Sequence, residues 1–129
     1  MSGRYLLDTN VIIDLLANEE SVRTMLGEAE EAFVSSIAIG ELYYGAEKST
    51  RPEENVSRIE QFATVTTVLA CDSETARHYG QIKNMLRAKG RPIPENDLWI
   101  AAAARQHGLT LVSRDKHFTE IEDLPTVGW

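Results

Sequence analysis

Short apolar runs alternate with longer helical patterns along this 129-residue chain, and this alternation restricts the fold more than any other feature. The runs at 5–7, 32–35, 65–69 and 109–112 are typical of buried strands, and a short last strand is expected at 126–127. Strands separated by helices of ten or more residues indicate βαβ units and a parallel sheet. We therefore predict one α/β domain spanning residues 1–129, with three layers and a mostly parallel β-sheet flanked by helices.

The helices are predicted from apolar spacing and from the residues suited to begin them. Thr50 and Glu53 have the spacing of a capping box, with Pro52 in the first turn, so a helix should follow as far as residue 62 or 63. Asp72 is expected to cap another long helix. One helix is predicted to begin near residue 11, and three others are predicted at 21–32, 36–48 and 73–90. Two more are expected, one in the segment after Thr50 and one from residue 95 or 96 to just before Gly108.

Composition excludes several classes of protein. Apolar residues make up 43% of the chain and charged residues 26%, which is ordinary for a globular domain. Cys71 is the only cysteine, so neither an internal disulfide nor a zinc cluster built on cysteines can form. The apolar run at 98–104 is too short to cross a bilayer, and residues 1–7 lack the apolar core of a signal peptide. We expect a cytoplasmic protein without a membrane partner.

Four carboxylates lie where the predicted elements meet. Asp8 directly follows the first strand, Asp115 follows the strand at 109–112, and Glu41 lies in the helix after the strand at 32–35. Ligands of open parallel sheets bind beyond the carboxyl ends of the strands. Asp97 lies in the first turn of its helix, on the face that carries the apolar residues Ile100, Ala101 and Ala104, so its carboxylate should point toward the same edge.

Each acid also has a simpler explanation when taken alone. Asp8 could cap a helix, Asp97 could complement its own helix dipole, Glu41 could be solvated, and Asp115 could pair with a neighbouring cation. Taken together, converging carboxylates without counter-charges repel one another, and this repulsion favours a bound metal ion. An all-oxygen cluster suits Mg²⁺ or Mn²⁺ better than Zn²⁺.

The motifs around these acids form an ordered set that covers nearly the whole chain. They are Leu-Asp-Thr-Asn-Val-Ile at 7–12, Ser-Ile-Ala-Ile-Gly-Glu-Leu at 36–42 with Tyr44-Gly45, Pro-Ile-Pro-Glu-Asn-Asp-Leu-Trp-Ile-Ala-Ala at 92–102, Leu-Val-Ser-Arg-Asp at 111–115, and His117-Phe118. This set resembles PIN domains, and specifically the VapC-type toxin ribonucleases of bacterial and archaeal toxin–antitoxin pairs. Ser113 is a small departure, because the pattern more often has threonine there; both residues offer a hydroxyl.

The resemblance implies a Mg²⁺-dependent endoribonuclease, with Mn²⁺ able to substitute, that hydrolyses RNA phosphodiester bonds. It assigns Asp8, Glu41, Asp97 and Asp115 as the catalytic acids. We expect Asp8, Asp97 and Asp115 to be metal ligands, because ions held by carboxylates can activate water and stabilise a leaving oxygen. Residues expected to orient these carboxylates by hydrogen bonds are Thr9, Asn10 and Ser113.

The resemblance also implies partners: a cognate VapB-type antitoxin, a second copy of the chain in a homodimer, and a structured RNA such as tRNA. The loop at 90–94 resembles the subgroup that cuts the anticodon stem–loop of initiator tRNA. Leu15, Leu16, Tyr43 and Tyr44 are expected to line the antitoxin groove. The cations expected to contact RNA phosphates are Lys83, Arg87, Lys89, Arg91, Arg114 and Lys116, with His117, Arg4, Lys48 and Arg51 as further candidates.

The net charge of −7 argues against strong non-specific RNA binding, although four of the 20 acidic residues belong to the predicted site.

Two other interpretations compete with this one. A phospho-accepting receiver domain would need adjacent acids after its first strand, where this chain has Thr9 and Asn10. A catalytically silent PIN-like module that only binds RNA or protein would typically lack one of the four acids, and all four are present.

Overall fold

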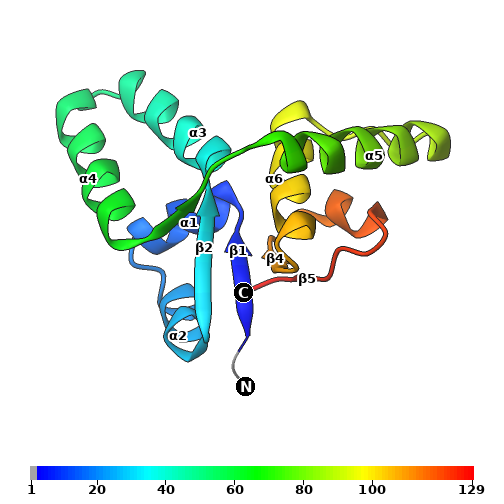
Figure 1. Cartoon of the computed structure of the whole chain (residues 1–129). Coiled ribbons are helices and arrows are strands. Elements are labelled where there is room, and N and C mark those ends of the chain that lie inside the picture. The colour runs from blue at the N-terminus through cyan, green and yellow to red at the C-terminus, as the bar shows by residue number, and fades with distance from the viewer. Residues whose placement is uncertain (1–2) are drawn as a thin grey trace.

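The computed structural model describes residues 3–129, which form five strands and six α-helices (Figure 1). In chain order they are β1 (Arg4–Leu7), α1 (Thr9–Leu16), α2 (Glu20–Glu28), β2 (Glu31–Ser35), α3 (Ser36–Glu47), α4 (Pro52–Val65), β3 (Thr67–Leu69), α5 (Ser73–Lys89), α6 (Glu95–Gln106), β4 (Thr110–Val112), the 3₁₀ helix η1 (Lys116–Glu120) and β5 (Thr126–Val127).

The sheet is entirely parallel, with strand order β3-β2-β1-β4-β5. The first three strands progress outward from β1 on one side, and β4 and β5 lie on its other side. The strand order therefore reverses between β1 and β4, and ligands of open α/β sheets bind beyond the carboxyl ends of the strands at such a point. The predicted α/β class is confirmed, and the sheet positions the residues after β1 and β4 beside each other.

The core lies around the central strands and α6. Leu6, Leu111 and Val112 are fully buried, and the alanines at 101–104 let α6 pack closely. Figure 1 shows α3 and α4 together on one side of the view, and α5 and α6 together on the other. In the part of the chain that the structure describes, no helix has both the length and the apolar character needed to span a membrane.

Three local predictions differ from the structure. The helix predicted at 21–32 ends at Glu28, and residues 31 and 32 already belong to β2. The predicted capping box at Thr50 is wrong: α4 begins after Arg51, which makes no side-chain cap, while Asn55 donates a hydrogen bond to the Ser49 hydroxyl at 2.9 Å. The strand predicted at 65–69 begins later, at Thr67, because α4 continues through Val65. The 3₁₀ helix η1 was not predicted from the sequence.

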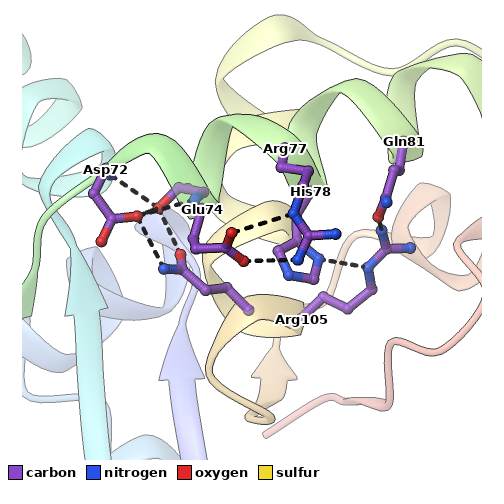
Figure 2. Close-up of polar contacts among 8 residues, drawn as sticks. Asp72, Glu74, Arg77, His78, Gln81 and Arg105 are labelled. Carbon is purple, nitrogen blue, oxygen red and sulfur yellow. Dashed lines mark hydrogen bonds and ion pairs between the residues drawn. The ribbon is translucent and has the colours of Figure 1, made fainter.

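A polar network joins α5 to α6 (Figure 2). As predicted, Asp72 caps α5, and its carboxylate accepts hydrogen bonds from the Thr75 backbone N–H and from Gln106 Nε2, both at 3.0 Å. Further along, Arg105 donates from Nε to His78 Nδ1 at 3.1 Å. These contacts fix the C-terminal end of α6 against α5.

Candidate active site

All four acids predicted from the sequence line one cleft of about 460 Å³. Asp8 comes from the end of β1, Glu41 from α3, Asp97 from the first turn of α6, and Asp115 from the segment after β4. The cleft lies at the carboxyl edge of the sheet, where the strand order reverses. The remaining residues that line it are Thr9, Asn10, Pro94, Glu95 and Asn96.

Asp8 is the most deeply buried member of the cluster, with 4% of its surface exposed. One carboxylate oxygen accepts a hydrogen bond from the Thr9 backbone N–H, and the other accepts one from the Ser113 hydroxyl, both at 2.8 Å. Burial raises the pKa of Asp8; these two hydrogen bonds oppose that rise, and the charges of Asp115 and Glu41 add to it. The site therefore holds a desolvated carboxylate in one fixed orientation.

Ser113 connects the two strand ends that meet at the cleft. While its hydroxyl donates to Asp8, the same oxygen accepts a hydrogen bond from the Asp115 backbone N–H at 3.0 Å. This buried serine thus sets the distance between the residue that follows β1 and the residues that follow β4. Ser113 thus contacts Asp8 directly, and its orienting role stays a prediction.

Glu41 is held from two sides. The Thr9 hydroxyl donates to one carboxylate oxygen at 2.6 Å, and Asn96 Nδ2 donates to the other at 3.4 Å. Asn10, also predicted to orient the carboxylates, lines the cleft but makes no side-chain hydrogen bond with the residues described. Asn96 has the contact expected of Asn10, a role that the sequence analysis missed.

Asp97 and Asp115 lie on either side of His117. His117 Nε2 is 3.0 Å from Asp97 Oδ2, and Nδ1 is 3.6 Å from Asp115 Oδ1. These are ion-pair distances; Nε2 is buried and has no hydrogen bond of good geometry with any residue in 3–129. The sequence places His117 two residues after Asp115, and η1 turns its ring toward α6, so sequence spacing alone could not reveal the contact.

The Asp97 carboxyl has the most perturbed electrostatic environment in the cleft. Burial raises its pKa to about 6, and the negative charge of Asp8 adds to the rise. His117 acts in the opposite direction, while Glu41 and Asp115 contribute further repulsion. The carboxylates of Asp97 and Asp115 and the imidazole of His117 can bring ligand atoms within 4.8 Å of one another. This donor set, crowded and short of counter-charge, fits a divalent cation.

Most cations predicted to contact RNA are engaged by protein groups. Arg114 pairs with Asp14 and Glu19, at 3.0 and 2.7 Å, and also donates to the Trp129 carbonyl. Lys83 pairs with Glu95 at 3.1 Å. The contacts of the others are Arg87 with Asn84, Lys89 with the Glu120 carbonyl, and Arg91 with the Glu120 carboxylate; Lys116 is exposed and forms no ion pair within residues 3–129.

Comparison with known families identifies the family of this chain. The family model described as PIN domain matches residues 5–124. The chain belongs to the PIN domain family. The match includes Asp8, Glu41, Asp97 and Asp115, so all four acids lie within the PIN domain.

Relatives that match this PIN domain over 98% of its length are named VapC. It is 42% identical to Ribonuclease VapC2 of Haemophilus influenzae, with 98% of each chain covered. It is 38% identical to the tRNA(fMet)-specific endonuclease VapC of Shigella flexneri, again with 98% of each covered. Among solved structures, the DNA-bound VapBC of Salmonella typhimurium has a TM-score of 0.91 at 36% identity, with 98% of each chain covered. The resemblance to VapC-type proteins is therefore confirmed.

Proposed function

We propose that this PIN domain is the toxin of a type II toxin–antitoxin pair and acts as a metal-dependent endoribonuclease. The observation that carries the proposal is the cleft in which Asp8, Glu41, Asp97 and Asp115 converge. Within residues 3–129, His117 is the one basic side chain at ion-pair distance from any of these four. Relatives named as ribonucleases across the same length support the activity.

The ion that suits this cleft best is Mg²⁺, with Mn²⁺ as a substitute, because the donors are mainly carboxylate oxygens. Asp8, Asp97 and Asp115 would hold it. When bound, a divalent cation activates the attacking water and stabilises charge on the leaving oxygen. Loss of the positive ion would leave the buried carboxylates repelling one another, as the raised pKa values of Asp8 and Asp97 indicate.

The protein's own residues position the reacting groups. Ser113 and the Thr9 backbone N–H hold Asp8 at fixed orientation, and Thr9 and Asn96 hold Glu41 at the side of the cleft. Glu41 can thereby orient a water molecule for attack on phosphorus. The water oxygen bonds to phosphorus and the P–O3′ bond breaks, which leaves a 5′-phosphate on one product and a 3′-hydroxyl, protonated from the water, on the other.

The substrate class we propose is a structured RNA such as tRNA, with the anticodon loop of initiator tRNA as the specific candidate. The tRNA(fMet)-specific names of two relatives support this choice. The segment 90–94, which precedes α6 in this chain, carries the sequence resemblance to that subgroup. These RNAs are cytoplasmic, and we propose the same location for the protein.

The partner we propose is a VapB-type antitoxin, which would bind a homodimer of this chain. An apolar hollow of about 380 Å³ between α1, α3 and α4 offers a surface for antitoxin side chains, and its lining includes Ile13, Leu16 and Ile59. Ile13 is 48% exposed, so its side chain is accessible to a partner. Of the groove residues predicted from the sequence, Leu16 lines this hollow, whereas Leu15 lines another near β3 and Tyr44 a third beside the acidic cleft.

Sequencing the 5′ ends of total RNA after incubation with antitoxin-free protein and Mg²⁺ tests this proposal. We expect one dominant cut site in a tRNA, absent with EDTA and absent with Asp8→Asn. Circular dichroism of Asp8→Asn should show an intact fold. If the wild type makes no metal-dependent cut, the proposal is wrong and the chain is a binding module.

A further inference from the structure

A second hollow, of about 650 Å³, adjoins the acidic cleft along α3. Three residues, Thr9, Glu41 and Asn96, line both spaces, and their hydrogen bonds to one another form the boundary between the cleft and the hollow. Tyr44 and Lys48 line its outer part. A chain bound across the four acids would therefore reach this hollow by passing over Thr9, Glu41 and Asn96.

Tyr44 and Lys48 form an exposed pair one helical turn apart. The Tyr44 side chain is 68% exposed, and Lys48 Nζ lies 4.8 Å from the centre of its ring. Gly40, one turn before Tyr44, also lines the hollow, and a Cβ added there would meet no atom within 4 Å. The result is an exposed aromatic ring with a cation over one face and unfilled space near Gly40.

Lys48 differs from most of the cations near the cleft. Lys83 is paired with Glu95, and Arg114 is paired with Asp14 and Glu19. Lys48 makes no ion pair and no hydrogen bond through Nζ within the described residues 3–129, and its one recorded contact is the Tyr44 ring. Its ammonium is therefore available for an anionic ligand without breaking an ion pair or a hydrogen bond within residues 3–129.

We propose that Tyr44 and Lys48 form a binding subsite for one nucleotide of the RNA, adjacent to the phosphate that is cut. The inference rests on the proposed nuclease function. The base stacks on the Tyr44 ring, and the Lys48 ammonium binds the neighbouring phosphate. Aromatic stacking with nearby cations is how proteins hold unpaired nucleotides. A protein partner suits the neighbouring apolar hollow between α1, α3 and α4 better, because that hollow offers Ile13, Leu16 and Ile59 instead.

RNA binding can be separated from cutting by working in an Asp97→Asn background. The ligand is a fluorescein-labelled RNA stem–loop with a seven-nucleotide loop, one loop base being 2-aminopurine. Tyr44→Leu should raise the Kd about tenfold and abolish quenching of the 2-aminopurine, because stacking is lost; Tyr44→Phe should keep both. Lys48→Gln should raise the Kd and lower the slope of log K against log salt by about 0.7–0.9, the contribution of one phosphate contact, whereas Lys48→Arg should not.

Controls and kinetics decide the outcome. Arg77→Gln, which removes an exposed charge on α5 away from the cleft, should leave the Kd unchanged at moderate salt. In the otherwise wild-type enzyme, Tyr44→Leu should raise KM with kcat within about twofold, since uniform binding is lost. The weaker RNA binding and the higher KM should both occur in variants whose circular dichroism matches that of the wild type.

The subsite is wrong if Tyr44→Leu and Lys48→Gln leave the Kd, the 2-aminopurine signal and the KM unchanged while the wild type still cuts RNA. It is also wrong if these variants change only the oligomeric mass or the affinity for the antitoxin. Binding that depends on Tyr44 and Lys48, without cutting by the wild type, would instead sustain the subsite and contradict the proposed nuclease function. Absence of both binding and cutting would contradict both.

Discussion

Two groups of carboxylates in this protein have opposite electrostatic environments. In the α5–α6 network of Figure 2, Asp72 accepts hydrogen bonds from Thr75 and Gln106, and Glu74 pairs with Arg77 at 2.7 Å. Hydrogen bonds from Thr75 lower the pKa of Asp72, and the hydrogen bond and charge of Arg77 lower that of Glu74. In the acidic cleft, burial and neighbouring acids raise the pKa values of Asp8 and Asp97.

The opposite pKa shifts distinguish acids that stabilise the fold from acids that are suited to bind a ligand. Each carboxylate of the network has its partners within the chain, so its charged form is favoured without any added ion. The acids of the cleft are crowded together, with His117 as the one basic side chain close to them among the described residues. Bound protons or a bound cation relieve the repulsion within such a group. This relief of repulsion contributes favourably to the free energy of metal binding.

The largest expected effect is a loss of activity, and it should follow substitution of a cleft acid but not of an acid in the α5–α6 network. Asp97→Asn should lower kcat/KM for RNA by roughly a thousandfold or more, because a lost metal ligand removes several kcal/mol of transition-state stabilisation. Asp72→Asn should keep activity within about threefold. Both values come from initial rates on one labelled tRNA at saturating Mg²⁺; comparable losses in the two variants would contradict the distinction.

Ser113 should affect metal binding more than folding. Ser113→Ala removes the hydroxyl that orients Asp8 and should weaken Mn²⁺ or Mg²⁺ binding about 10–100-fold, as loss of a hydrogen bond to a ligand typically does. Ser113→Thr should restore most of the affinity, because threonine keeps the hydroxyl. Isothermal titration calorimetry measures this, with Ser57→Ala on exposed α4 as the control. Equal affinities for Ser113→Ala and wild type would show that the hydroxyl has no such role.

Without metal, Asp97 should make the fold less stable as the pH rises. Its pKa is about 6 in the folded chain and near 3.8 when unfolded, so its full contribution is present below pH 4 and is lost between about pH 4 and 6. Asp97→Asn should therefore raise the free energy of unfolding by about 1–2 kcal/mol above pH 6, and by little at pH 4. Urea titrations in EDTA at both pH values test this; a variant destabilised at pH 7.5 would contradict it.

Asp72 should show the opposite pH dependence, with the smallest effect. Its pKa is lowered by folding, so the stability that it contributes is present above the pKa of the unfolded chain and is lost as the pH falls through the folded value. Asp72→Asn should be less stable than the wild type at pH 7, and the difference should shrink on acidification. Thermal unfolding across pH 3–7 shows the sign directly. A gap that widens toward pH 3 would place Asp72 with the cleft acids.

The predictions from sequence succeeded where the signal was local. The apolar runs before Asp8 and Ser113 gave β1 and β4, and the cap at Asp72 marked the start of α5. They failed where two local preferences competed. Helix α4 continues through Val65 although its last residues favour a strand, and Ser49 and Asn55 bond to each other where a capping box at Thr50 was expected.

The sequence by itself determined the α/β class, the four acids and their order along the chain, because strand and helix periodicity and the motifs are local properties. Only the tertiary structure decided which charges have partners. Arg114 and Lys83 are taken by Glu19 and Glu95, and His117 is turned between Asp97 and Asp115. These contacts join residues far apart in sequence or depend on the path of η1. The desolvation that raises the pKa of Asp8 likewise exists only in the folded chain, where Asp8 is buried.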